Sequence, residues 1–337
     1  MLSLIIISTL VVGCAKDGKL KSKEEIKIGV TLYKQDDVFI STISSNLEEI
    51  VKKNGSNYDF KILLETLDAK GSTLNQGNQV DKFINQDYDV ICVNLVDRTA
   101  AATIIDKVKY ADIPIIFFNR EPVEEDMNRW NKVYYVGAQA EQSARLQADI
   151  VAEQWNSNKE LYDKNKDGII QYVMLEGEPG HQDSLIRTEY CIKSLNEKGI
   201  QLEKLADDSA NWQSDQANSK MTQWIKEFGD KIEVVFSNND GMALGAIHAI
   251  NSNSALIRKP IVVGVDGIKE AMESIKNKEM NGTVISDSVA QAEAIFEIAI
   301  DVAQGKSLED ISDMEKEKYK KIPHTKVTIN NVDKYLK

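Results

Sequence analysis

The stretch EVVFSNNDGMALGAIHAI, residues 233 to 250, decides the fold. It opens with a short apolar run rich in β-branched residues, passes through the polar residues Asn238 to Asp240, and continues as a helical pattern. An apolar strand that leads directly into a helix is typical of a parallel sheet whose two faces are covered by helices. The stretch therefore predicts a strand-helix unit with a polar turn at the carboxyl end of the strand.

The same alternation runs along the chain from Ile26. Short apolar runs recur at IKIGVTL, FKILLET, DVICVNL, IPIIFF, KVYYVG, IIQYVML, IVVGV and GTVIS, with a weaker strand near 200–205. Helices are expected at 41–53, 74–86, 98–109, 140–157, 183–198, 214–228, 240–253, 267–277 and 288–304. About ten strands in repeated βαβ units, in a chain of 337 residues, predict an α/β protein of two doubly wound parallel-sheet domains.

Charge and cysteine content narrow the class of protein. The formal net charge is −12, which argues against a nucleic-acid partner because a phosphate backbone requires a basic face. Three cysteines are too few for a disulfide framework. Cys92 and Cys191 are predicted to be small buried apolar residues.

The amino-terminal segment indicates export. Residues 2–13 form an apolar run of 12 residues, which is shorter than the roughly 20 needed to span a bilayer but suits a signal peptide. The sequence VVGC, which ends at Cys14, resembles the bacterial lipobox, so we expect a signal peptide over 1–14, lipidation of Cys14 and a polar tether over 15–25. The segment lacks the usual Lys/Arg start, and an ordinary cleaved signal or an uncleaved anchor are the alternatives.

Polar residues gather where the predicted strands end, and ligands bind at that edge of such sheets. These segments are rich in Asn, Asp and aromatic residues, and they contain neither GxGxxG nor GxxxxGK[ST]. Hydroxyls pair with carboxylates and amides while sugar C–H faces stack on rings, so the composition favours a sugar ligand. A glycosidase would need two opposed carboxylates, which the sequence leaves open, and the GxSxG nucleophile motif is absent.

The stretch DKNKDGIIQ, residues 163 to 171, begins like a calcium loop. Asp163, Asn165 and Asp167 alternate and Gly168 follows, but the twelfth position, where a bidentate Glu is usual, holds Met174. From these residues alone, an incomplete metal site and a polar turn both remain open.

Several of these segments, in the same order, resemble the periplasmic galactose/glucose-binding proteins, the sugar receptors of an ABC importer. The segments are GVTLYKQDDVF, NLVD, FFNREP, YYVG, DKNKDGIIQ, GEPGHQDS, NWQSDQA, EVVFSNNDGMALGA and VVGVDG. The resemblance implies the type I periplasmic binding protein fold, with two lobes joined by a three-segment hinge. It divides the chain into an N-terminal lobe of 26–137 plus 286–321 and a C-terminal lobe of 138–285 plus 322–337.

The resemblance also implies a hexose held between two rings. Phe39 and Trp212 would stack on opposite faces of the sugar, and Asp37 would read the hydroxyl that separates glucose from galactose. The other implied sugar-binding residues are Asn119, His181, Asp183, Arg187, Asn239, Asp266 and Ser286. At Ser286 the chain departs from the family, which has Asn, so weaker binding or an altered preference is expected. For the polar residues a simple helix cap or turn is the alternative.

For the loop, the resemblance implies a structural calcium ion completed by a distant carboxylate. The ligands would be the side chains of Asp163, Asn165, Asp167 and Gln171, the carbonyl of Ile169, and bidentate Glu233. Calcium would tie the loop to the sheet and stabilise the fold by linkage.

The implied function is that of a monomeric, exported binding protein without catalytic residues. It would bind D-galactose or D-glucose, close about the hinge, and present the closed lobes to an ABC permease, and in some family members to a chemotaxis receptor. A binding protein for ribose or xylose is the nearest alternative, and a glycoside-processing enzyme is the alternative from another class. A transcription regulator of the same fold would carry a helix-turn-helix where this chain has its signal segment.

Overall fold

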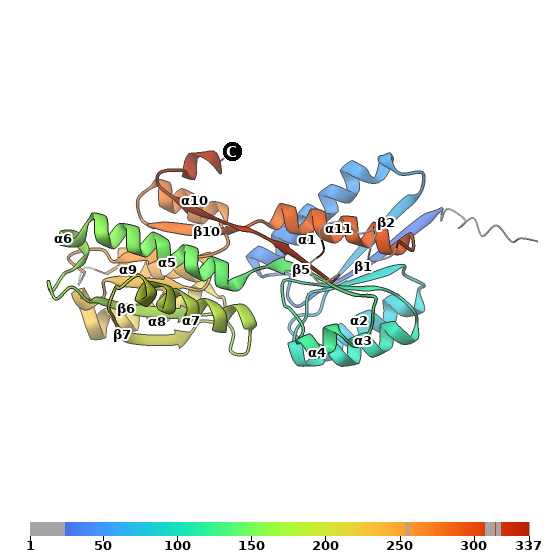
Figure 1. Ribbon diagram of the computed structural model, residues 1–337, viewed down its shortest axis with the longest axis horizontal. Helices are drawn as coiled ribbons and strands as arrows, with labels where there is room; N and C mark the ends of the chain where they lie inside the picture. The colour runs from blue at the N-terminus through green and yellow to red at the C-terminus, as the bar shows by residue number, and fades with distance from the viewer. Residues whose placement is uncertain (1–23, 254–255, 307–313, 315–317, 337) are drawn as a thin grey trace, which may run out of the picture.

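The computed structural model describes residues 24–253, 256–306, 314 and 318–336. The predicted signal segment 1–14, Cys14 and most of the tether 15–25 lie outside these residues. Within the described part, the chain forms two lobes side by side, each built on one six-stranded sheet (Figure 1). No helix in that part is long and apolar enough to cross a membrane.

The first lobe contains a sheet in which all paired neighbours are parallel. Across the sheet its strands are β11 (Tyr319–Ile322), β5 (Val133–Ala138), β4 (Ile115–Phe118), β3 (Val90–Val93), β1 (Glu25–Leu32) and β2 (Lys61–Asp68). Along β1, Ile26, Ile28 and Val30 enter the core on one face. On the other face Gly29 lies against Phe83, and a Cβ there would come within 2.6 Å of that ring, so the close approach requires glycine.

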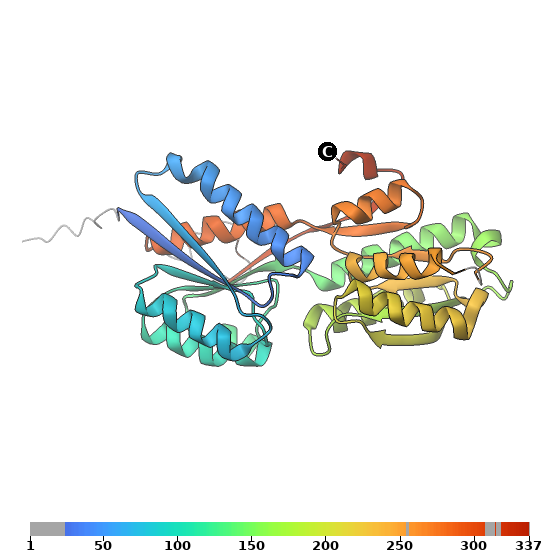
Figure 2. The ribbon, with the colours of Figure 1, turned by 180° about the vertical axis from the view of Figure 1, so that it is seen from behind.

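Helices cover both faces of this sheet, as the near-continuous apolar strands predict. One face carries α1 (Val38–Asn54) and α11 (Ser288–Ala303), and the other carries α2 (Thr73–Asn85) and α3 (Ala101–Tyr110), with the short α4 (Glu124–Met127) beside them (Figure 1). Seen from behind, α1 begins on the side of its lobe that faces the other lobe (Figure 2). Its first residues are therefore available to a site between the lobes.

The second lobe repeats the design with one antiparallel edge. Its strands, in order across the sheet, are β12 (His324–Thr328), β10 (Gly282–Ser286), β9 (Ile261–Val263), β8 (Val234–Ser237), β6 (Ile170–Glu176) and β7 (Leu202–Ser209). Strand β12 pairs antiparallel with β10, and the other pairs are parallel.

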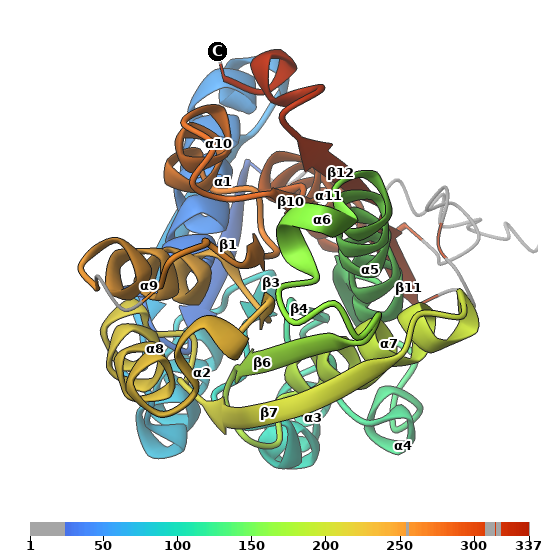
Figure 3. The same cartoon turned by 90° about the vertical axis from the view of Figure 1, so that its left-hand side faces the viewer.

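The helices of the second lobe also lie in two layers, visible down the long axis (Figure 3). One layer holds α5 (Ala140–Ser157), α6 (Lys159–Tyr162) and α7 (Gln182–Glu197); the other holds α8 (Ser214–Phe228), α9 (Asp240–Asn251) and α10 (Lys269–Lys276). Single 3-10 turns occur at Gly55–Asn57, Arg98–Ala100, Gly229–Lys231 and Val332–Lys334.

The chain passes between the lobes three times. The passages lie between β5 and α5, between β10 and α11, and between β11 and β12. The long strand-like passage near the carboxyl terminus is seen in Figure 1. The domain limits implied by the resemblance, at 137/138, 285/286 and 321/322, stay a prediction, and each falls at or next to the end of one of these strands.

The structure differs from the sequence-based expectations at the edges. Strands β11 and β12 were not predicted, because no strand was expected after GTVIS, and the antiparallel direction of β12 was not foreseen. The short helices α4 and α6 were also missed. Cys92 and Cys191 are free and fully buried, as predicted.

Candidate functional site

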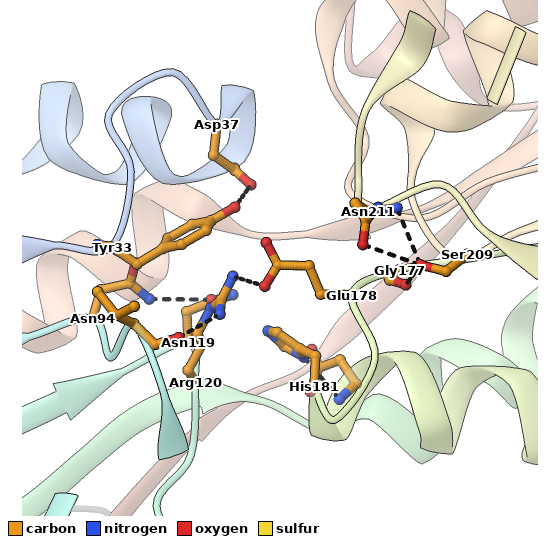
Figure 4. Close-up of polar contacts among 12 residues, drawn as sticks. Tyr33, Asp37, Asn94, Asn119, Arg120, Gly177, Glu178, His181, Ser209 and Asn211 are labelled. Carbon is orange, nitrogen blue, oxygen red and sulfur yellow. Dashed lines mark hydrogen bonds and ion pairs between the residues drawn. The ribbon is translucent and has the colours of Figure 1, made fainter. Parts of the chain in front are cut away.

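A cavity lies between the two lobes, where strand ends of both sheets meet. The residues that line it come from the first lobe and from the second. They are Tyr33, Asp37, Phe39, Ile40, Asn119, Arg120, His181, Trp212, Asn239 and Asp266. Several of these side chains point toward one another across the gap in Figure 4. The cavity therefore occupies the position at which parallel α/β sheets bind ligands.

Seven of the ten predicted sugar-binding residues line this cavity, while Asp183, Arg187 and Ser286 do not. Asp183 and Arg187 form an ion pair of 2.9 Å one turn apart on α7, which begins at the cavity. Ser286 ends β10 and is buried. The structure thus brings together seven candidates and places the other three on adjoining elements; their roles toward a ligand stay a prediction.

Three of the lining residues are helix N-caps. Asp37 caps α1, His181 caps α7 and Asn239 caps α9. The bonds come from the backbone N–H of Ile40 to Asp37 (2.9 Å), of Asp183 to His181 (3.1 Å) and of Met242 to Asn239 (2.9 Å). A cap bond occupies one polar atom and fixes the side chain. Capping and cavity lining are thus combined in the same residues.

Three other lining residues have unusual backbone conformations. The φ angles of Asn119, Trp212 and Asp266 are 60°, 64° and 128°. Residues other than glycine rarely adopt a positive φ. Such backbone strain concentrates at functional sites, where a side chain must point at a ligand. Asn119 is held by a bond of 3.2 Å from the Asn94 side chain.

The two aromatic rings come from opposite lobes. Phe39 lies in the first turn of α1, and Trp212 lies in the turn between β7 and α8. Trp212 packs edge-on against the His181 ring, with centroids 5.0 Å apart. It also lies against Gly177, where a Cβ would come within 2.1 Å of the indole. Its Nε1 is buried without a hydrogen-bond partner.

The charged groups around the cavity are strongly influenced by burial. Burial raises the pKa of Asp183 and that of Asp266, although Arg187 opposes both shifts. Burial also holds the pKa of His181 well below its usual value, with a further contribution from Arg120. His181 is therefore a neutral imidazole with one donor and one acceptor nitrogen.

Asp240 is a supporting residue that the sequence reasoning did not select. It is fully buried and accepts hydrogen bonds from the Gly267 N–H (2.7 Å), the Ile268 N–H (3.0 Å) and the Thr283 hydroxyl (2.6 Å). These bonds fix the loop that carries Asp266. Burial raises the pKa of Asp240 to about 6 in spite of the three donors.

Tyr33 and Arg120 are lining residues that were also missed. The guanidinium of Arg120 lies 3.7 Å from the centroid of the Tyr33 ring, and the Tyr33 hydroxyl donates to Asp37 at 2.5 Å (Figure 4). Arg120 forms an ion pair of 2.9 Å with Glu178 of the other lobe. Tyr33 directly follows β1 and Arg120 lies two residues after the end of β4, and this position after a strand was the signal available in the sequence.

The calcium-like loop joins α6 to β6. Its side chains bond to one another: Asn165 donates to Asp167 (2.7 Å) and to Gln171 (3.2 Å), and Asp167 accepts from Ile169 N–H (2.7 Å). Glu233 accepts from the backbone N–H of Lys164 (2.6 Å) and of Gln171 (3.1 Å), which ties the loop to the strand at β8.

Two features of this loop fit a cation. Asp163 Oδ1 is buried without a partner, and burial raises the pKa of Glu233, to which Asp163 and Asp167 add like charge. A cation would relieve both. The described residues contain no group of three or more His, Cys, Asp or Glu side chains placed to hold a metal, so Asp163, Asp167 and Glu233 of the predicted set do not form a ready-made carboxylate cluster.

Two α/β lobes around a polar and aromatic interlobe cavity define a two-lobed ligand-binding protein. The chain belongs to the family described as periplasmic binding protein domain, whose model matches residues 28–307. This membership confirms the predicted fold class. Because the family is one of binding proteins, it also confirms the expectation that the chain is not an enzyme.

Individual proteins of this class are similar over most of the chain. The D-galactose/methyl-galactoside binding periplasmic protein MglB of Haemophilus influenzae is 39% identical over 313 residues, covering 92% of each chain. A putative rhizopine-binding protein of Rhizobium meliloti is 28% identical, covering 84% of this chain and 86% of its own. An ABC transporter solute binding protein from Bacillus halodurans, solved with bound myo-inositol, has a TM-score of 0.78 and 29% identity, covering 94% and 99%.

Proposed function

We propose that this chain is the extracytoplasmic sugar-binding component of an ABC importer and that it binds D-galactose or D-glucose between its lobes. One observation carries the proposal: Phe39 and Trp212 come from opposite lobes into one cavity whose remaining wall is mostly polar, with amide, carboxylate, imidazole, phenol and guanidinium groups beside Ile40. Aromatic faces and hydroxyl-pairing groups are what a pyranose requires. The name of the Haemophilus influenzae relative supports the choice of galactose.

Sugar binding would be coupled to closure of the lobes. A ligand that contacts Asp37 and Phe39 on one side and His181 and Trp212 on the other favours the conformation in which all four contacts are made at once. The three interlobe passages would act as the hinge. The closed surface would then dock a membrane permease, and a chemotaxis receptor would be a second partner.

Other polyols are the main alternative ligands. The Rhizobium relative is named for rhizopine and the Bacillus structure holds myo-inositol, so the same cavity type accepts ligands other than galactose. Ser286 is shorter than the Asn expected from the family, which favours a weaker or altered preference here. Ribose and xylose remain the pentose alternatives.

For location, the proposal is an exported protein held at the membrane by lipid on Cys14, with residues 15–25 as the tether. The VVGC sequence supports it. For the loop at 163–171, the proposal is a structural calcium ion, held by Asp163, Asn165, Asp167, Gln171, the Ile169 carbonyl and Glu233. Bound calcium would neutralise the buried carboxylates and fix the loop to the sheet.

Calorimetric titration of the purified protein with galactose, glucose, ribose, xylose and myo-inositol tests the function. Micromolar or tighter binding of a hexose, with pentoses much weaker, is the expected result. A second assay offers nitrophenyl galactoside, and its turnover would contradict a purely binding role. If the folded protein binds none of the hexoses, the proposed ligand is wrong.

A further inference from the structure

Two buried polar residues face each other where β10 and β12 leave the hinge. The strands pair antiparallel with Ser286 directly opposite His324, so the two side chains lie on the same face of the sheet. Their residues are 5% and 7% exposed. Figure 3 shows β10 and β12 adjacent at the edge of their sheet. The two segments belong to different interlobe passages, so this pair lies at the hinge itself.

The hydrogen-bonding capacity of this pair is largely unused. Both ring nitrogens of His324 are buried without a partner. Gln291, in the first turn of α11, donates from Nε2 to the Ser286 hydroxyl at 3.1 Å, while its Oε1 is buried without a partner. Buried polar groups are nearly always paired, because an orphaned one loses its hydrogen bonds to water without replacement. Three orphaned atoms on neighbouring residues point to a ligand that pairs with them.

The position of this cluster relates it to the cavity. Ser286 N–H donates to the Asp266 carbonyl at 3.0 Å, and Asp266 lines the cavity. Arg187 is near enough to His324 to add to the effect of burial, which lowers the pKa of His324 to about 3. Arg187 Nε is itself buried without a partner. The imidazole is therefore neutral and offers one donor and one acceptor beside the predicted sugar residues.

A sugar hydroxyl has the chemistry that this cluster lacks. A hydroxyl donates one hydrogen bond and has two acceptor lone pairs, so it can accept from the imidazole N–H while it donates to Gln291 Oε1, which pairs two of the three orphaned atoms. A cation would be repelled by Arg187, and an anion would find Arg187 already paired with Asp183 and the imidazole neutral. A water molecule has the same chemistry as a hydroxyl, and the experiment must separate the two sources.

We propose that His324, together with Gln291 and Ser286, forms a hydroxyl-binding subsite at the hinge end of the cavity and that His324 is a specificity-determining residue for the sugar. This inference rests on the proposed function and deepens it. Because the subsite includes residues from two of the three passages, a hydroxyl bound there would also join the hinge segments in the closed form.

The test pairs changes in the protein with single deletions in the ligand. Dissociation constants are measured calorimetrically for the best-binding hexose and for each of its monodeoxy derivatives, with the wild-type chain and with H324F. One deoxy sugar should bind the wild type about tenfold more weakly than the parent, whereas H324F should bind that deoxy sugar and the parent equally. The other deoxy sugars should keep their wild-type ratios.

Controls separate a lost contact from a damaged fold. H248F changes an exposed histidine on α9 and should leave every ratio unchanged. H324N keeps a donor and an acceptor and should retain part of the selectivity; it also serves if H324F fails to fold, which thermal melting would show. Equal weakening of all sugars by H324F and H324N, or no change, would mean that the cluster holds water only, and the inference would be wrong. Absence of hexose binding by the wild type would instead overturn the proposed function.

Discussion

Arg120, which lines the cavity, and Glu178 of the other lobe form an ion pair of 2.9 Å that joins the two lobes (Figure 4). The Arg120 side chain is 6% exposed and its guanidinium lies over the Tyr33 ring. Tyr33 in turn donates to Asp37. The Glu178 carboxylate thus helps to position Asp37 through the stacked Arg120 and Tyr33 side chains. Asp37 is the carboxylate predicted to contact the hydroxyl that separates glucose from galactose.

We predict that E178Q weakens sugar binding by roughly ten- to a hundredfold, because it leaves the buried Arg120 charge without its counter-ion. Calorimetry gives the affinity, and stopped-flow kinetics should place most of the loss in faster dissociation. D112N removes the partner of Lys132 in an exposed pair and should change nothing. Wild-type affinity in E178Q would show that the pair does not contribute to closure.

Gly177 should be required for the position of Trp212. In G177A the new Cβ would overlap the indole, so the ring must move, and sugar binding should fall about tenfold or more while the protein stays folded. Loss of the sugar-induced change in tryptophan fluorescence is the second readout. G55A is the matched control, since that position has open space and an ordinary helical backbone. Normal binding by G177A would place Trp212 outside the sugar site.

Calcium removal should destabilise the second lobe. At a free calcium concentration about a thousandfold above its dissociation constant, the ion adds about 4 kcal/mol to the free energy of unfolding, so chelation should lower the melting temperature by several degrees. E233Q should already melt low and respond little to chelation. An identical melting temperature with calcium and with chelator would rule out the proposed site.

Asp240 should make stability depend on pH. Its ordinary pKa of 3.8 rises to about 6 in the folded protein, so the folded state binds the proton more tightly than the unfolded state. The free energy of unfolding contributed by this group is therefore greatest below pH 3.8 and falls as the pH rises to about 6, by up to about 1.4 kcal/mol per pH unit.

The D240N variant tests this sign. An amide can still accept from Gly267 and Ile268 and can donate to Thr283, so the loop should hold while the titration disappears. Urea unfolding between pH 4 and about 7 should show a wild-type curve that falls relative to that of D240N. D333N, on the exposed surface, controls for net charge. Parallel curves for wild type and D240N would contradict the predicted titration.

The sequence predicted best those elements whose structure depends on interactions between residues close together in the chain. Helices such as Ala140–Ser157 and Ser214–Phe228 occur where the periodicity indicated them, since an apolar stripe and a cap are encoded within a few turns. The edge strand β12 was missed because its five residues, HTKVT, are too few to show a clear alternation, and nothing in them specifies pairing with β10. So short a pattern cannot distinguish an edge strand from a hinge segment.

The candidate site divides in the same way. Asp37 and Asn239 could be selected from sequence because residues after buried strands lie at the ligand-binding edge of a parallel sheet. Arg120 follows a strand as well, but its importance depends on Glu178, some sixty positions away on the other lobe. Such a contact exists only once the lobes have packed.

By itself, then, the sequence determined the alternation of strands and helices and the polar character of the strand ends, because both follow from side-chain periodicity within one element. Only the tertiary structure decided which strand ends face each other, that Arg120 meets Glu178, and that His324 lies opposite Ser286. The physical reason is that these meetings depend on where three interlobe passages place two separately packed sheets, and no local pattern specifies that geometry.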